Sequence, residues 1–121
     1  MGHSVVHLRK DGIVQVNFGD NVELDLKETK EIVEAISKIT GGKKAQVLNI
    51  AGKNTTATRE ARNYSASEAG GECTLADAFV VNNLPQKLIG NFYLNFNKPM
   101  VNTKIFNSVD DALKWLKQQS V

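Results

Sequence analysis

The fold is decided by the stretch AQVLNIA at residues 45–51, a short apolar run followed by a segment, residues 55–69, without proline or glycine. The run is too short for a typical helix and is typical of a strand buried on both faces of a sheet. In the segment that follows, Ala57, Ala61, Tyr64 and Glu68 recur at helical spacing. We therefore expect a central strand and then a helix whose small inward residues pack closely on the sheet.

The chain before this stretch is expected to form a hairpin and one helix. Two strand-like runs, residues 5–8 and 13–18, flank an Asp-Gly pair, which is a strong local hairpin signal. Asp25 and Glu28 have the spacing of a helix N-cap and its partner, and apolar residues then recur at helical spacing. The glycine pair at residues 41–42 predicts the end of that helix.

The chain after the central strand predicts two more strands and two more helices. The strands are expected at residues 77–81 and 103–106, while Asn83 opens a third helix and Ser108 caps a final one. The order is therefore ββαβαβαβα, in one α/β domain over residues 1–121. Because helices connect the later strands, these strands should be parallel, with the hairpin as the antiparallel edge of a mixed sheet.

Composition narrows the function classes. Fifteen basic and thirteen acidic side chains leave a net charge of +2, and the lysines are scattered, which argues against nucleic acid as a partner. No apolar run approaches the roughly 20 residues of a membrane span. The N-terminus lacks the apolar core of a signal peptide, and the single cysteine, Cys73, is expected to be buried or inert. We predict a cytoplasmic protein.

Patterns for catalysis or metal binding are sparse. His3 and His7 have no carboxylates placed beside them, so neither a metal nor a cofactor is predicted. Asp77, at the start of a predicted strand, is better explained by local capping than by acid–base chemistry. An enzyme would require the fold to bring His7 within hydrogen-bond reach of a threonine or a carboxylate in a cleft. We therefore predict that the chain is not an enzyme.

Three stretches, together with the element order, carry a family resemblance. They are TREARNY at 58–64, IGNFYL at 89–94 with NKP at 97–99, and the ending at 106–116. These features resemble the STAS domain of sulfate-transporter tails and bacterial anti-sigma-factor antagonists, and more narrowly a group of small uncharacterised bacterial STAS-like proteins. The resemblance spans nearly the whole chain. It implies a STAS-like fold and a non-enzymatic regulatory or protein-interaction module.

The resemblance also draws attention to the turn after the central strand. In the antagonists this turn carries an Asp-Ser-Ser-Gly-like motif whose Ser or Thr is phosphorylated by a partner kinase. Here the turn is GKNTTATR at 52–59, and the aspartate and the glycine of the motif are both missing. Hydroxyl groups remain at Thr55, Thr56 and Thr58, so the position of a phosphoswitch is kept without its motif.

Basic and hydroxyl side chains gather around the same turn. A helix N-terminus has unpaired N–H groups and a positive dipole end, which suit an anion or a phosphorylated threonine held by arginine. Alternatively, one threonine is only the N-cap and the arginines form a solvated face. The candidate binding residues here are Lys53, Thr55, Thr56, Thr58, Arg59 and Arg62.

Apolar side chains of the third helix form the second candidate surface. Leu88, Ile89, Phe92, Tyr93 and Phe96 cover an arc of roughly 140° at about 100° per residue. An exposed part of this strip would mark a surface for a protein partner, a second copy or a lipid-like ligand. Alternatively, the helix lies across the sheet and buries nearly all of it. Phe92, Tyr93 and Phe96 are the predicted binding residues, either in a protein contact or around a small apolar or anionic ligand.

Overall fold

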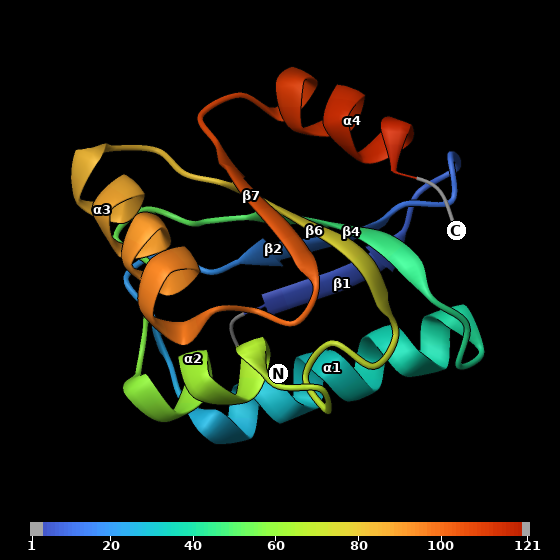
Figure 1. Cartoon of the computed structure of the whole chain (residues 1–121), viewed down its shortest axis with the longest axis horizontal. Coiled ribbons are helices and arrows are strands. Elements are labelled where there is room, and N and C mark those ends of the chain that lie inside the picture. The colour runs from blue at the N-terminus through green and yellow to red at the C-terminus, as the bar shows by residue number, and fades with distance from the viewer. Residues whose placement is uncertain (1–3, 120–121) are drawn as a thin grey trace.

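The computed structural model describes residues 4–119 and has a five-stranded sheet at its centre (Figure 1). The strand order is β1-β2-β4-β6-β7, with β1 antiparallel to β2 and the other neighbours parallel. The predicted mixed sheet, its hairpin edge and its central strand are confirmed. These strands are β1 (Ser4–Leu8), β2 (Val14–Phe18), β4 (Ala45–Ile50), β6 (Thr74–Val80) and β7 (Asn102–Phe106).

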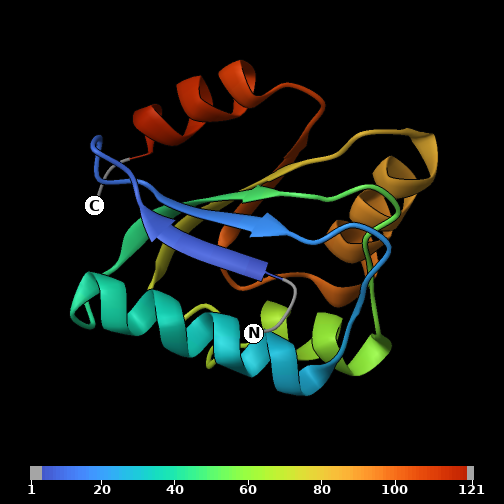
Figure 2. The same ribbon diagram turned by 180° about the vertical axis from the view of Figure 1, so that it is seen from behind.

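Helices cover both faces of the sheet. Helices α1 (Leu26–Thr40) and α2 (Arg59–Ala66) lie on one face, and α4 (Val109–Gln118) lies on the other (Figures 1 and 2). Helix α3 (Leu84–Phe92) follows β6 and stands at the end of the sheet where β4 and β6 finish. This arrangement leaves α3 beside the sheet rather than across its face.

The alternation of side chains along the strands produces a separate core on each face. Leu48, Ala78 and Leu116 are fully buried and belong to the core under α4. Val14 and Val47 belong to the core under α1. Because successive residues of a strand point to opposite faces, β4 contributes to both cores.

Local signals place the helix ends as expected. The side chain of Asp25 accepts a hydrogen bond from the backbone N–H of Glu28 at 2.8 Å, and Asn83 and Ser108 cap α3 and α4 in the same way. Gly41 ends α1 in the left-handed conformation, with φ of 66°. These predicted boundaries are confirmed.

The second helix is shorter than predicted, because the chain before it pairs with a distant segment. Thr56–Ala57 forms strand β5, which lies parallel to β3 (Glu23–Leu24). The backbone N–H of Thr56 donates to the carbonyl of Val22 at 2.9 Å. The prediction of a helix over residues 55–69 is therefore wrong at both ends, and α2 occupies Arg59–Ala66.

The third helix changes its winding before it ends. After α3, residues Tyr93–Asn97 form a π-helical turn, η1, closed by a hydrogen bond from the Lys98 N–H to the Tyr93 carbonyl at 3.2 Å. The predicted strands at 77–81 and 103–106 correspond to β6 and β7, which begin earlier than expected. Over residues 4–119, no helix is long and apolar enough to span a membrane.

Candidate functional site

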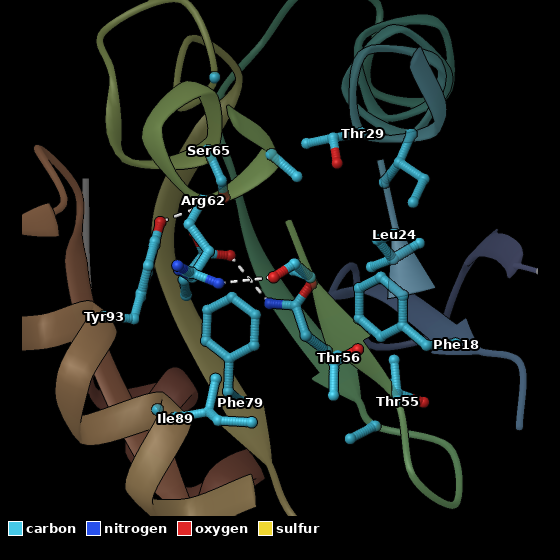
Figure 3. Close-up of a pocket in the computed structure, with 18 of the residues that line it drawn as sticks. Phe18, Leu24, Thr29, Thr55, Thr56, Arg62, Ser65, Phe79, Ile89 and Tyr93 are labelled. Carbon is cyan, nitrogen blue, oxygen red and sulfur yellow. Dashed lines mark hydrogen bonds between the residues drawn. The ribbon is translucent and has the colours of Figure 1, made fainter. Parts of the chain in front are cut away.

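A cavity of about 180 Å³ lies between the sheet and the helices α1, α2 and α3 (Figure 3). Most of its wall is apolar, and it opens toward the surface. Figure 3 shows Phe79 and Ile89 on one side of the cavity and Phe18 and Leu24 on the other. The cavity thus occupies the sheet face that α1 and α2 only partly cover.

The cavity exists because the side chains between α2 and the sheet are small. Ala57, Ala61 and Ser65 line it from the α2 side, and α2 packs on α1 and η1 rather than on the strands. The prediction that the small residues Ala57 and Ala61 pack closely on the sheet is wrong, since the space beside them is not filled. Small side chains create a close contact only when a neighbouring backbone approaches them.

Asn49 and Asp77 are polar residues of the sheet that line this mainly apolar space. The Asn49 amide donates to the Asp77 carboxylate at 3.0 Å and to the Ala78 carbonyl at 3.2 Å. Burial raises the pKa of Asp77 from its ordinary value of 3.8 to about 6, although the hydrogen bond from Asn49 opposes this change. Asp77 is thus a carboxyl that can hold a proton close to neutral pH.

Polar groups of α2 and η1 complete the wall. Nη1 of Arg62 donates to the carbonyl of Ala57, whereas Nε of Arg62 is buried without a hydrogen-bond partner. The hydroxyl of Tyr93 donates to Ser65 at 3.1 Å, and burial raises the pKa of Tyr93 further above its usual range. Within residues 4–119, no carboxylate lies within 4.0 Å of the Arg62 guanidinium.

An exposed apolar ridge runs along the outer side of α3 and η1. Four large side chains at intervals of four residues form it, with exposed fractions of 67% for Leu84, 60% for Leu88, 46% for Phe92 and 71% for Phe96. We call these four residues the α3–η1 stripe. The rings of Phe92 and Phe96 stack with centroids 4.5 Å apart. The predicted strip is therefore largely exposed, and only its Tyr93 is buried.

The stripe lies next to the cavity. The guanidinium of Arg62, which lines the cavity, lies 5.6 Å from the ring centroid of Phe92 on the stripe. Ile89 also lines the cavity while 37% of its surface is exposed. Arg62 from the cluster at the turn and Phe92 from the predicted strip are therefore neighbours in the fold.

Comparison with known proteins identifies the family. A family model described as a domain of unknown function, DUF7793, matches residues 6–120. The chain belongs to this family. No curated protein matches it. Among solved structures, this DUF7793 chain is similar to an uncharacterised protein of the DUF3478 family from Shewanella loihica PV-4, which is described as having a SpoIIAA-like fold.

The structural likeness covers 94% of each chain with a TM-score of 0.68, at 13% sequence identity. At this identity it shows the fold alone. The STAS-like fold predicted for the DUF7793 chain is confirmed.

The candidate binding residues in the turn between β4 and α2 of the DUF7793 chain have different surroundings. Thr58 is the N-cap of α2, accepting a hydrogen bond from the Ala61 N–H at 3.1 Å, and Arg59 is exposed. Thr55 and Thr56 line the cavity from the loop and β5, and the Thr55 hydroxyl donates to the Gly19 carbonyl at 2.9 Å. Lys53 is exposed and lies outside the cavity wall. Arg62 is the basic residue of this group that reaches the cavity.

Asn49 and Asp77, which line the cavity from the sheet, were not selected from the sequence. Asp77 lies within β6, not at its start, so the capping interpretation of this residue is wrong. Asn49 carried a usable signal, because an asparagine inside a strand buried on both faces requires a hydrogen-bond partner. Its partner could not be named without the pairing of β4 with β6.

Other predicted features of the DUF7793 chain also have a place. Cys73 is buried, as predicted. His7 is exposed on the edge strand β1 and does not line the cavity, whereas His3 lies outside the described residues. Within residues 4–119 there is no group of three or more His, Cys, Asp or Glu side chains that could hold a metal ion.

Proposed function

We propose that this domain is a non-enzymatic interaction module that docks a protein partner through the α3–η1 stripe. The observation that carries the proposal is the exposure of four large apolar side chains on one ridge. Scattered exposed apolar residues are normal on a protein surface, whereas contiguous ones typically mark a contact surface. Phe92 and Phe96 are suited to anchor such a contact, because aromatic side chains contribute much contact area at low entropic cost.

Charge around the stripe indicates the chemistry of the partner. Residues 78–109 contain Lys87, Lys98 and Lys104 but no aspartate or glutamate. The amines of Lys87 and Lys98 are on exposed residues of the segment that carries the stripe. We infer a partner whose apolar surface is bordered by carboxylates, such as an amphipathic acidic helix.

The cavity and its surroundings give no support to an enzymatic role. Arg62, Asp77 and Tyr93 are the ionisable residues among those that line the cavity. The hydroxyl of Thr55 bonds to the Gly19 carbonyl, and the hydroxyl of Thr58 caps α2. Since His7 lies elsewhere, no nucleophile with an adjacent base faces the cavity within the described part of the chain. We therefore favour binding over catalysis.

The docking proposal is tested by removing the stripe and comparing it with an equal loss elsewhere. Leu88→Ser with Phe96→Ser removes apolar surface from the stripe, and Val5→Ser with Leu8→Ser is the control, since these two exposed residues lie on β1. Proteins captured from the native lysate by the wild type and by the control, and lost with the stripe variant, would support docking. Capture that all three proteins share equally would contradict it.

Self-association and lipid binding are the other uses that such a stripe could serve. Sedimentation of the purified protein distinguishes a second copy, and co-sedimentation with vesicles rich in anionic lipid distinguishes a membrane surface. If only the stripe variant changes its oligomeric state, a second copy of the chain is the occupant of the stripe. If only the stripe variant loses binding to vesicles, the occupant is a membrane surface.

A second candidate function is the binding of a small ligand. The observation that favours it is the cavity beside Tyr93, since a filled interior at this place would have excluded it. The cavity wall includes Ile89, which is partly exposed on the same helix as the stripe. Ligand binding would therefore act close to the docking surface.

A further inference from the structure

We propose that the cavity binds a small organic acid, with its carboxylate on the Arg62 guanidinium and its apolar body between the sheet and helices α1 and α3. This inference rests on the second candidate function, names the class of its ligand and does not depend on docking through the stripe. It rests on the volume of the cavity, its mainly apolar wall and the incomplete hydrogen bonding of Arg62.

The size of the cavity limits the ligand. An apolar cavity of about 150 Å³ in another protein binds benzene. The present cavity, at about 180 Å³, therefore accommodates one aromatic ring or a short alkyl chain, but not a full lipid. Phe18, Leu24, Ile32, Phe79 and Ile89 offer apolar contacts to such a body.

The unsatisfied arginine indicates the charge of the ligand. A guanidinium has five N–H groups, and Arg62 uses one nitrogen for the Ala57 carbonyl while its buried Nε lacks a partner. The cation also lacks a carboxylate within salt-bridge distance among residues 4–119. Placing a cation beside an apolar cavity without an anion is costly, and a carboxylate forms paired, charge-assisted hydrogen bonds with arginine. An organic acid would supply this carboxylate, and its contact would be with the Nη atoms, because the Nε is enclosed.

The remaining polar groups of the wall are compatible with one carboxylate. The amide of Asn49, the hydroxyl of Tyr93 and the side-chain amide of Gln86 already donate within the protein. Asp77 is the acidic residue among those that line the cavity, and in its protonated form it can donate a hydrogen bond to a ligand carboxylate. Arg62 is then the fixed positive charge of the wall.

The test compares acids with neutral isosteres of the same shape. Benzoate and benzamide, and hexanoate and hexanamide, are titrated into the ¹⁵N-labelled wild type while amide chemical shifts are followed. We expect saturable shifts of the Ala61, Arg62 and Gly90 amides, with each acid binding at least about tenfold more tightly than its amide, because hydrogen bonds to a charged group are the stronger ones. Equal affinity for the acid and its amide would refute the proposal, as would shifts that never saturate.

Variants locate the binding within the cavity. Arg62→Met keeps the apolar stem and removes the charge, so we expect about a tenfold or larger loss of affinity for benzoate. Arg59→Met, on the same helix but exposed and outside the cavity wall, is the matched control and should bind normally. Ala61→Leu should abolish binding by filling the space. Unchanged binding in both Arg62→Met and Ala61→Leu would place the acid elsewhere and overturn the assignment. If a variant does not fold, the comparison of acid with amide in the wild type decides the question.

Discussion

The carboxyl of Asp77 makes a quantitative prediction about stability. Burial raises its pKa from 3.8 to about 6, so the folded protein holds this proton more tightly than the unfolded chain does. Stability from this group is therefore fully present below pH 3.8 and is lost as the pH rises through about 6. The difference between the two pKa values means that the free energy of unfolding is lower by at most about 3 kcal/mol well above pH 6 than below pH 3.8.

Replacing Asp77 by asparagine removes this loss. The side-chain amide that Asp77→Asn introduces keeps an oxygen that can accept the Asn49 hydrogen bond, and it never ionises. We expect the free energy of unfolding of the variant, relative to the wild type, to rise by about 1–1.5 kcal/mol between pH 5 and pH 8. Urea unfolding followed by fluorescence of Trp115, which packs against Phe106, measures this difference at several pH values.

The pH dependence separates this effect from ordinary loss of contacts. A change in packing alone would alter stability equally at all pH values, and Glu68→Gln, an exposed carboxyl outside the cavity, is the control. If the relative stability of Asp77→Asn is independent of pH, folding leaves the pKa of Asp77 unchanged, and if it falls as the pH rises, the fold stabilises the carboxylate. Either result would contradict a pKa of Asp77 that burial raises.

Two further predictions test the α2 cap and the exposure of the stripe. Thr58→Ala removes the hydroxyl that caps α2 and should lower the free energy of unfolding in urea by about 1 kcal/mol. Thr58→Ser keeps a hydroxyl and should retain most of that stability. Equal stability of the two variants would contradict the cap. Phe96→Ser should change the free energy of unfolding by less than about 0.5 kcal/mol, because the ring is exposed. Leu116→Ala, in the core under α4, should cost about 2–5 kcal/mol in the same assay, and a comparable cost for Phe96→Ser would show that the ring is buried in solution.

Local patterns were sufficient for most of the fold. The Asp-Gly hairpin, the caps at Asp25, Asn83 and Ser108 and the apolar run at 45–51 are properties of short segments, and all lie where the sequence placed them. The pairing of β5 with β3 was missed because it joins residues far apart in the chain. Helical spacing of residues 57–64 then extended the predicted helix into a segment that tertiary hydrogen bonds hold as a strand.

The candidate site was less accessible to sequence reasoning. Arg62 and Tyr93 were selected, yet their approach to one cavity depends on how α2, α3 and η1 sit around the sheet. The cavity itself could not be predicted, because small side chains are equally consistent with close packing. Exposure of the predicted strip on the third helix was one of two alternatives, and the position of α3 at the end of the sheet decided between them.

Photo-crosslinking in the native cell tests the docking surface most directly. A photoreactive amino acid replaces Phe96 on the stripe or, as a control, Leu8 on the exposed edge strand β1. Docking of a protein partner predicts a discrete crosslinked protein from position 96 that is absent from position 8. Crosslinks to lipid alone from position 96, or the same products from both positions, would contradict it.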